Sequence, residues 1–501
     1  MVSLDSTILT QKALRRFGVD AIGYLVAKLI PALTGFLSAF IFTRLFSPED
    51  YGTYSLIVAI VTPATILVAE WGAQPLGRFF SEFHVTGHGE VYRTLLKRLA
   101  KSVLLVAVVV ATIMLVYGRQ AWGARASVAA ALWLIVESLG HVLVPILPAS
   151  LDAQSYRLYE VGRSVLKLSL SVLLVWAFQP AIDLLLWGSA LGASIMTVPL
   201  LERVRAHVRL PRGEVERPSF ALSQHEIRKQ FGRFVGYGLP MMGWFFSSQL
   251  LAVGDRYVIS IFLGSQAVGL YSATYNVVSG ISGLLSGPVT FAAFPIIMRM
   301  WAEGQIVETR RVLSEMTVWY FLLGFGLIAG LALVGQDLAA MILGPSFRPG
   351  WVIALPVVTG MVFWNASILG HKSLELSEQT KLMLVAALAA ATFNVAANLL
   401  VVPLYGIEAA AFTTLSSYAL YAVVIWILSR RTAVPWDIPW KAVGVVLVVA
   451  VGSFGVTKIL LIEGVWGAIL KGSAFTVLHL GLSVAYLGHA RRKPGPLRRN
   501  R

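Results

Sequence analysis

The chain has 501 residues, contains no cysteine and carries few charges. Without cysteine it has no disulfide, no thiolate ligand for zinc and no cysteine nucleophile. Only 13% of its residues are charged, whereas 57% are hydrophobic and the mean hydropathy is +0.74. A soluble protein of this length could not cover its surface with so few charges, so we predict an all-α protein that crosses a membrane many times.

Features of an enzyme or an ATP-driven pump are also missing. The sequence has no Gly-x-x-x-x-Gly-Lys-Ser/Thr loop for ATP phosphates and no polar stretch long enough for a nucleotide-binding domain. We find no grouping of nucleophile, metal ligands and general base. The sequence therefore predicts a transporter without cofactor or metal, driven by an H⁺ or Na⁺ gradient or by the supply and removal of substrate.

Fourteen apolar runs are long enough for a membrane-spanning helix, which needs about 20 mostly apolar residues. Short proline-containing turns separate two pairs of runs, at Gln179-Pro180 and between Pro403 and Gly406. The predicted spans are 18–43, 52–74, 102–118, 126–148, 158–179, 181–202, 234–263, 267–290, 313–335, 351–371, 381–402, 407–429, 439–461 and 465–488.

The net charge of +16 reflects membrane topology. With both termini in the cytoplasm, 33 of the 41 lysines and arginines fall on the inner side, among them Arg163 and Lys167, and six on the outer side. We therefore expect a multi-pass protein of the cell (inner) membrane, without a nucleic-acid partner. No short apolar core with a cleavage site appears in residues 1–18, so we expect the first helix to act as the insertion signal.

Two similar stretches lie 217 residues apart, Tyr51-Gly52-Thr53-Tyr54-Ser55 and Val268-Gly269-Leu270-Tyr271-Ser272. A helix pair that recurs once indicates a chain built from two similar halves in the same orientation. We predict an N-terminal lobe of six helices (1–203), a basic cytoplasmic linker (204–230), a C-terminal lobe of six helices (231–430), a helix pair (431–490) and a basic cytoplasmic tail (491–501).

Three stretches, residues 44–56, 255–272 and 294–304, resemble the Wzx-like polysaccharide-biosynthesis branch of the multidrug/oligosaccharidyl-lipid/polysaccharide (MOP) exporter superfamily. Many members have twelve helices, and the extra pair here matches the members with fourteen. The resemblance implies a flippase for a polyprenyl-pyrophosphate-linked oligosaccharide. It also implies two lobes arranged as a V around a central cavity that opens alternately to each side. Whether the extra pair adds a lipid groove, as in lipid II flippases of the superfamily, stays open.

Ionised side chains within the spans are candidates for function, because an unpaired charge in hydrocarbon costs several kcal/mol. Lys28 lies ~18 Å along a helix from Arg16, too deep to reach the cytoplasm easily. It binds the substrate pyrophosphate or pairs with a carboxylate. Arg256 lines the cavity while Asp255 orients it or carries a proton, or else the pair locks the outer gate between the lobes. In the plan that the resemblance implies, Arg44, Arg78 and Arg299 flank the cavity mouths and steer an anionic head group.

Glu137 and His141 lie four residues apart on one helix face, a spacing at which a carboxylate and an imidazole can share a proton. They form a coupling site or a clamp between helices. Glu70 lies near the inner end of its predicted helix, which favours a hydrated helix end over a coupling role. Asn365, Asn394 and Asn398 more often belong to a packing seam than to a sugar track.

The partners expected are the lipid-linked oligosaccharide, membrane lipids and possible contacts with a polysaccharide polymerase and glycosyltransferases, and the chain is expected to be a monomer. One alternative is a cation-coupled multidrug exporter of the same superfamily, which would need an acidic cavity. Another is a non-transporting scaffold of a polysaccharide assembly complex, which would tolerate neutral cavity residues.

Overall fold

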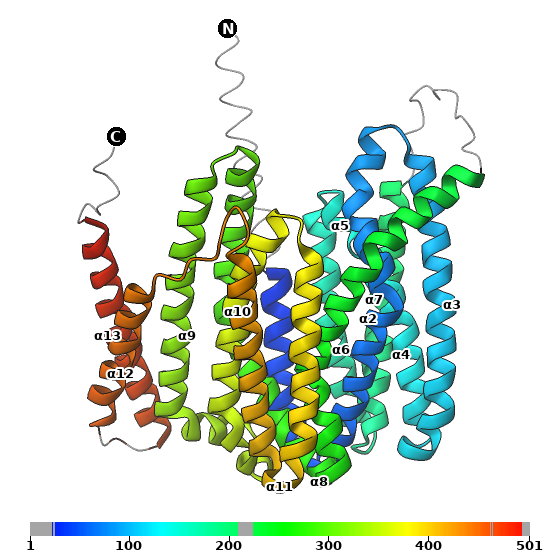
Figure 1. Cartoon of the computed structure of the whole chain (residues 1–501). Helices are drawn as coiled ribbons and strands as arrows, with labels where there is room; N and C mark the ends of the chain where they lie inside the picture. Colours follow the sequence, from blue (N-terminus) through cyan, green and yellow to red (C-terminus); the bar gives the residue numbers. More distant parts are fainter. Residues whose placement is uncertain (1–22, 24–25, 209–223, 461, 463, 493–501) are drawn as a thin grey trace. The chain divides into compact units, whose positions relative to one another are not determined.

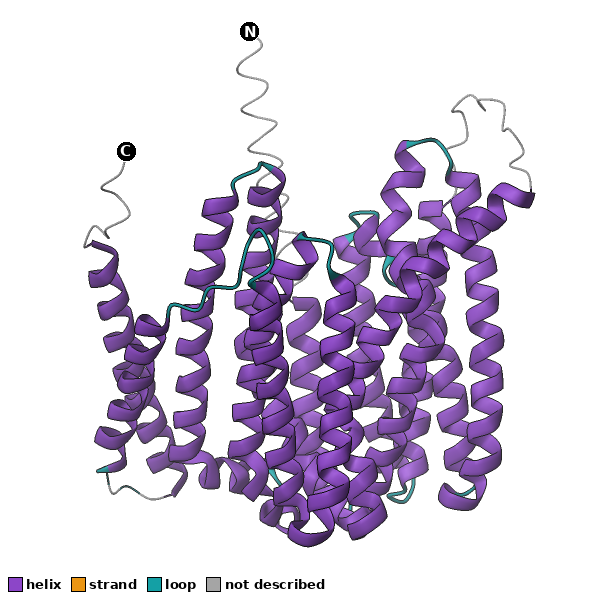
Figure 2. Ribbon diagram, viewed as in Figure 1, coloured by secondary structure: helices purple, strands orange, loops and turns teal. Residues whose placement is uncertain are grey.

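The computed structural model describes residues 23, 26–208, 224–460, 462 and 464–492. Helices make up nearly all of this part of the chain, and no strand occurs in it (Figure 2). The start of the first predicted helix, much of the predicted linker and most of the predicted tail lie outside the described residues. The fold is the predicted one, an all-α membrane protein.

Each of the fourteen predicted spans coincides with a helical segment (Figure 1). Ten described segments are long and apolar enough to cross a membrane, counting bent α11 as one. The helices are the first helix (Val26–Leu45), α2 (Pro48–Val85), α3 (Gly89–Trp122), α4 (Ala124–Leu143), α5 (Ile146–Ala149), α6 (Ala153–Ala177), α7 (Ile182–Val208), α8 (Gln224–Ala302), α9 (Ile306–Ile342), η1 (Pro345–Ile353), α10 (Ala354–Leu376), α11 (Thr380–Ser429), α12 (Trp440–Lys458) and α13 (Gly464–Arg492).

Two long helices bend where a glycine adopts a positive φ. α8 bends at Gly264, with φ of 80°, and α11 bends at Gly406, with φ of 70°. A residue with a Cβ is strained in this region, so glycine is the residue that allows the bend. The turn predicted between Pro403 and Gly406 contains the bend at Gly406, while the helix continues through Pro403.

Several helices extend beyond their apolar runs, and α2 is the clearest case. Ser47 caps its start by accepting a hydrogen bond from the Asp50 backbone N–H at 3.1 Å, and Pro48 occupies the first helical position. The predicted end near residue 74 is wrong, because α2 continues to Val85. Phe79, Phe80 and Phe83 are buried along this extension, so its packing against the unit 1 core sustains the helix.

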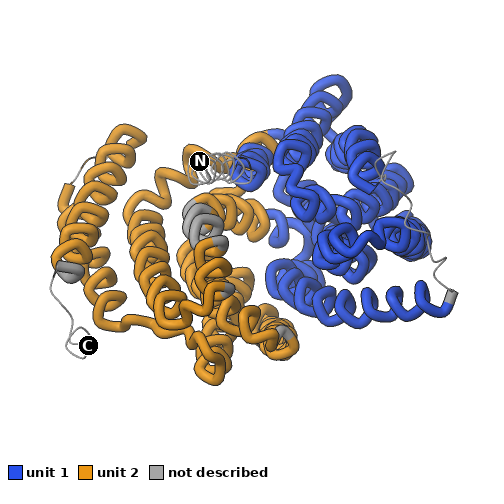
Figure 3. Tube along the Cα trace, turned by 90° about the horizontal axis from the view of Figure 1, so that it is seen from above, with its two compact units in different colours: residues 1–38, 45–269 blue, residues 39–44, 270–501 orange. Residues whose placement is uncertain are grey.

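The chain divides into two compact units (Figure 3). Unit 1 comprises residues 1–38 and 45–269, and unit 2 comprises residues 39–44 and 270–501. The unit boundary falls inside α8, after its bend, and the predicted lobe boundaries stay a prediction. In unit 1, α4 packs against α2, α3 and α7, and α6 packs against α7. In unit 2, α10 packs against α11, and α9 packs against α10, α12 and α13.

The two glycines of the repeated stretch lie against each other within unit 1. A Cβ added to Gly52 would lie 1.8 Å from the Ser265 carbonyl oxygen and 2.9 Å from the Gly269 backbone nitrogen. A Cβ added to Gly269 would lie 1.8 Å from the Pro48 carbonyl oxygen. Such a backbone-to-backbone approach has room for hydrogen but not for a methyl group, so both copies need glycine here.

Candidate functional site

A row of polar and charged side chains runs along one face of α6. Tyr156, Glu160, Arg163 and Lys167 are spaced by four, three and four residues, which places them above one another on a helix. Arg163 and Lys167 lie ten and fourteen residues beyond the first residue of α6, or ~15 Å and ~21 Å along its axis. The row therefore extends well into the interior of the helix bundle of unit 1.

The start of α6 is fixed by a side-chain cap outside the spans. Asp152 accepts hydrogen bonds from the Ser155 backbone N–H at 2.9 Å and from His207 Nε2 at 2.9 Å. Partial burial alone would raise the pKa of Asp152, but the hydrogen bonds from Ser155 and His207 lower this pKa overall. The cap defines the first turn and so sets which residues share the charged face.

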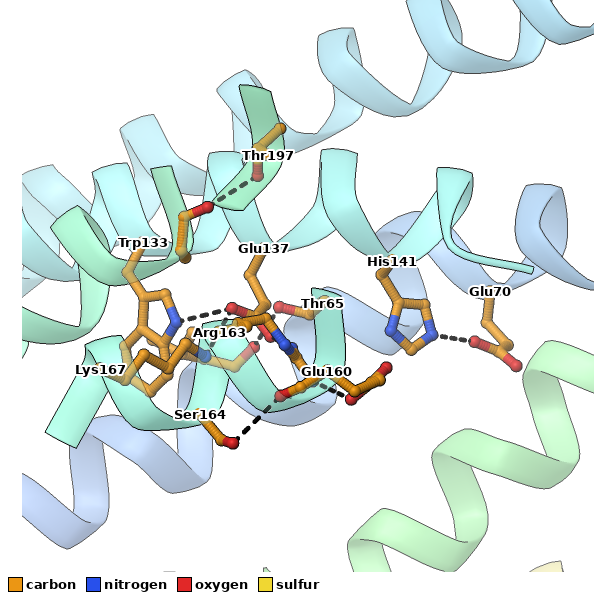
Figure 4. Close-up of polar contacts among 12 residues, drawn as sticks. Thr65, Glu70, Trp133, Glu137, His141, Glu160, Arg163, Ser164, Lys167 and Thr197 are labelled. Atoms are coloured by element: carbon orange, nitrogen blue, oxygen red, sulfur yellow. Dashed lines mark hydrogen bonds and ion pairs between the residues drawn. The ribbon is translucent and has the colours of Figure 1, made fainter. Parts of the chain in front are cut away.

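Glu137 of α4 forms ion pairs with two cationic side chains of α6, Arg163 and Lys167 (Figure 4). Its carboxylate accepts hydrogen bonds from Arg163 Nη1, from Lys167 Nζ at 2.7 Å and from Trp133 Nε1 at 3.0 Å. Arg163 Nη2 also donates to Glu160 Oε2 at 3.1 Å. The side chains of Glu137, Arg163 and Lys167 are 13%, 24% and 20% exposed, so these ions are paired in a largely dry environment.

Lys28 of the first helix adjoins the same face. Lys28 is exposed, and its Nζ lies 5.5 Å from the centroid of the Tyr156 ring. We name Lys28, Glu137, Glu160, Arg163 and Lys167 the α6 cluster. When all five are ionised, its three cations exceed its two carboxylates by one positive charge.

His141, one turn further along α4 than Glu137, has a different partner. Its Nε2 contacts Glu70 Oε2 of α2, while Gln74 Nε2 donates to Glu70 Oε1 at 2.6 Å (Figure 4). The predicted sharing of a proton between Glu137 and His141 is therefore not what the structure shows. Residues four apart on a helix are neighbours, but here Glu137 turns to α6 and His141 turns to α2.

Glu70 is not a hydrated helix end. Its side chain is 3% exposed, and α2 continues for 15 residues beyond it. The expectation was wrong because it placed the end of this helix where the apolar run ends. A buried carboxylate in contact with a 35% exposed imidazole makes this pair the better candidate for proton exchange.

Asp255 and Arg256 lie in the first half of α8, in unit 1, and both are buried, with exposed fractions of 0% and 5%. Asp255 Oδ1 accepts a hydrogen bond from the Arg256 backbone N–H at 2.8 Å. The neighbouring Tyr257 hydroxyl donates to the Ala59 carbonyl of α2. These contacts fix the segment against α2, and the role of the Asp255–Arg256 pair at the substrate stays a prediction.

Arg44 holds the end of another helix. Its Nη1 donates to the Ile342 carbonyl at 2.5 Å and its Nη2 to the Met341 carbonyl at 2.7 Å, at the last turn of α9 in unit 2. Carbonyls at a helix end have no partner within the helix, so the guanidinium acts as a cap. Arg78 is exposed, and Arg299, 75% exposed, pairs with Glu303 at 2.8 Å. Their roles at a cavity mouth stay predictions.

A groove in unit 2 is lined by residues of α9 and α13. It has a cavity volume of about 510 Å³. Its lining is mostly apolar or small and includes Val334, Leu338 and Met341 of α9 and Ala468, Ile469 and Gly472 of α13. Such a lining suits a hydrocarbon chain better than a polar head group.

The α6 side chains were missed as site residues by sequence reasoning. Arg163 and Lys167 were assigned to the positive residues of the inner side, whereas they lie inside α6 and pair with Glu137. A signal was present, because Tyr156, Glu160, Arg163 and Lys167 repeat at helical spacing. The spacing shows that they share a face but not that this face meets Glu137.

The sequence comparisons place this geometry among known proteins. The model of a family described as "Polysaccharide biosynthesis protein" matches residues 18–301. An uncharacterized membrane protein of Methanocaldococcus jannaschii is 24% identical over 242 residues, which are 47% of this chain and 46% of that protein. The "probable low-salt glycan biosynthesis flippase Agl15" of Haloferax volcanii is 20% identical over 294 residues, 59% of each chain. The chain thus spans about half the length of these curated relatives.

Solved structures show the same fold at low identity. The lipid II flippase MurJ in an inward closed conformation superposes with a TM-score of 0.73 and 13% identity, over 93% of this chain and 99% of that one. A multidrug resistance MATE family transporter of the MOP superfamily, in its inward-facing conformation, gives a TM-score of 0.60 and 12% identity, over 81% and 94%. At this level of identity the likeness concerns the fold.

Proposed function

The chain belongs to the polysaccharide biosynthesis protein family, and we propose that it is a flippase for a polyprenyl-pyrophosphate-linked oligosaccharide. It would move this lipid from the cytoplasmic to the outer leaflet of the cell (inner) membrane by alternating access. The flippase named among its relatives and the fold shared with a lipid II flippase support the proposal.

The observation that carries the proposal is the α6 cluster. Charges buried within membrane helices are expensive, and they mark substrate or ion pathways far more often than they stabilise a fold. The exposed Lys28 gives the cluster more cations than carboxylates, which suits an anionic passenger. A pyrophosphate linkage is such an anion, whereas the sugar hydroxyls require only neutral hydrogen-bonding groups.

A multidrug exporter for cationic drugs fits the cluster less well. A cationic ligand needs a surplus of carboxylates, and the α6 cluster has the opposite balance. The Glu70–His141 pair adds one carboxylate, but Gln74 and His141 already occupy its oxygens. A scaffold without transport would have no use for buried ions at all.

The test is a deletion strain that accumulates lipid-linked oligosaccharide. We expect the lipid to be trapped in the cytoplasmic leaflet, out of reach of a membrane-impermeant label, and polymer export to stop. Plasmid-borne Lys28→Ala and Arg256→Ala variants are expected to insert normally and fail to restore export. Arg311→Gln, which removes an exposed cation of α9, serves as the matched control and should restore it.

Full export by both Lys28→Ala and Arg256→Ala at normal expression would contradict the assigned roles of these residues. Normal labelling of the lipid on the outer leaflet of the deletion strain would contradict the flippase itself. If Lys28→Ala and Arg256→Ala both still support polymer assembly while the deletion does not, the non-transporting scaffold is the correct alternative.

A further inference from the structure

Arg163 carries a hydrogen-bond donor that the described part of the chain leaves without an acceptor. Its Nη1 and Nη2 donate to Glu137 and Glu160, whereas its buried Nε–H meets no acceptor there. Buried donors have a partner in the great majority of native proteins, and an unsatisfied one is costly inside a membrane. An acceptor from outside the chain would satisfy this donor.

Lys167, one turn further along α6, has more N–H donors than its contact with Glu137 uses. An ammonium has three N–H groups, and one of them donates to Glu137 Oε2 at 2.7 Å. Its Nζ also lies 5.0 Å from the centroid of the Trp133 ring, which favours the charged form without using a hydrogen bond. Arg163 and Lys167, four residues apart on one helix face, thus share the carboxylate of Glu137, and Arg163 has Glu160 as a second partner.

We propose that Arg163 and Lys167 bind the phosphate oxygens of the substrate diphosphate, and that Glu137 is their internal counter-ion when no diphosphate is bound. This inference rests on the proposed function, which supplies a substrate that carries a diphosphate. A planar guanidinium matches phosphate oxygens through two parallel N–H donors, and the free Nε–H of Arg163 is one of them. Lys28 supplies a third cation at the same face.

The Glu137 carboxylate explains how Arg163 and Lys167 can stay charged and buried when no substrate is bound. Two uncompensated cations in a dry interior would repel each other, and the carboxylate of Glu137 offsets both. The Trp133 indole N–H holds this carboxylate in place through a bond that does not involve the cations. An arriving diphosphate therefore competes with Glu137 for donors that are already oriented.

This competition separates the proposal from a merely structural ion pair. If Glu137 competes with the ligand, the isosteric Glu137→Gln variant frees the two cations and binds the anion more tightly. If the three residues only clamp α4 to α6, the same variant loses stability and its anion affinity stays as in the wild type.

The experiment uses the purified full chain in detergent with inorganic pyrophosphate as the probe and sulfate at matched ionic strength as the reference. Binding is followed by calorimetry, and thermal unfolding without pyrophosphate verifies that each variant is folded. We expect saturable binding that sulfate does not reproduce. Arg163→Gln and Lys167→Gln should each weaken it about tenfold, and Glu137→Gln should tighten it about tenfold. Arg311→Gln should bind as the wild type does.

If Arg163→Gln does not fold, Arg163→Lys keeps the charge but removes the Nε–H, and it should still weaken binding severalfold. Equal binding of sulfate and pyrophosphate, or unchanged affinity in a folded Glu137→Gln variant, overturns the inference. A different result would reject the proposed function. A deletion strain that flips its lipid normally would reject the flippase, while pyrophosphate binding to the pure protein would leave the anion site standing.

Discussion

The polar interiors of the two units differ in kind. In unit 1, α4 and α6 are joined by ions, with Glu137 between Arg163 and Lys167. In unit 2, the two halves of α11 are joined by neutral groups. Asn394 Nδ2 donates to Ser417 Oγ at 3.1 Å, and Asn398 Nδ2 donates to Asn394 Oδ1 at 3.1 Å.

The difference shows which polar groups serve packing. The amides and hydroxyls of α11 satisfy one another, and a neutral hydrogen bond between membrane helices contributes only about 1 kcal/mol. This network confirms that Asn394 and Asn398 belong to a packing seam. The ions of unit 1 are far more expensive to bury, and they leave the Nε–H of Arg163 unsatisfied within the described residues. A site that is costly and incomplete is better explained by a ligand.

The largest expected effect comes from removing the shared carboxylate of unit 1. Glu137→Leu leaves Lys167 without its carboxylate partner and Arg163 with Glu160 alone, and breaking a buried ion pair costs about 3–5 kcal/mol. Unfolding of the purified variant in mixed micelles should show a loss of this size. A loss below about 1 kcal/mol would mean that water already screens these charges.

The next effect concerns the repeated glycines rather than the polar groups. Gly52→Ala places a methyl group against the Ser265 carbonyl, and overpacking of this kind costs about 1–3 kcal/mol. Gly283→Ala is the matched control, because a Cβ there meets nothing within 4 Å. Thermal unfolding should separate the two variants, and equal melting temperatures would contradict the close approach.

A smaller effect is expected in the neutral network of unit 2. Asn398→Leu removes the acceptor of the Thr413 hydroxyl and the donor to Asn394, at a cost of about 1–2 kcal/mol. Because no charge is left behind, the loss should be well below that of Glu137→Leu. Comparable losses for the two variants would remove the distinction between ionic and neutral interiors.

The Glu70–His141 pair allows the comparison between the two units to be tested by transport activity rather than by stability. We propose that it exchanges the proton that couples transport, because it joins a buried carboxylate to a partly exposed imidazole. In vesicles, an imposed proton gradient should change the flipping rate about tenfold, or about 1.4 kcal/mol, in the wild type and no more than about twofold in Glu70→Gln. An unaltered response of Glu70→Gln, or a response to Na⁺ alone, would reject this assignment.

The smallest effect is expected at an exposed ion pair. Arg299→Gln breaks the contact with Glu303, but water screens this exposed pair and its loss leaves no buried charge behind. Its melting temperature should match the wild type within error, while Glu137→Leu should not. The contrast tests burial alone, because both variants remove one partner of an arginine–carboxylate pair.

Much of the fold was predictable from the sequence. Apolar runs near the length of a membrane span located the long helices, and ten described segments are long and apolar enough to cross a membrane, because hydrocarbon selects for length and apolarity residue by residue. Helix ends were less predictable, as α2 shows, since packing of Phe79, Phe80 and Phe83 extends it beyond its apolar run. The bend of α11 falls within the turn predicted between Pro403 and Gly406, and the positive φ of Gly406 places it at that residue.

The candidate site was only partly predictable. Lys28, Glu137, His141 and Glu70 stood out because each is an ionisable side chain in an apolar run. Arg163 and Lys167 did not, because both were counted among the positive residues that set topology. The partner of each charged side chain could not be predicted either, since spacing within one helix does not say which neighbouring helix a face contacts.

The sequence by itself determined that this protein is an all-α membrane protein without cysteine chemistry, since composition and run length depend on no contact between distant residues. The tertiary structure decided that Glu137 meets Arg163 and Lys167, that Glu70 meets His141, and that Gly52 lies against Gly269. These pairings depend on how each helix is rotated about its axis, and packing against several neighbours at once sets that rotation.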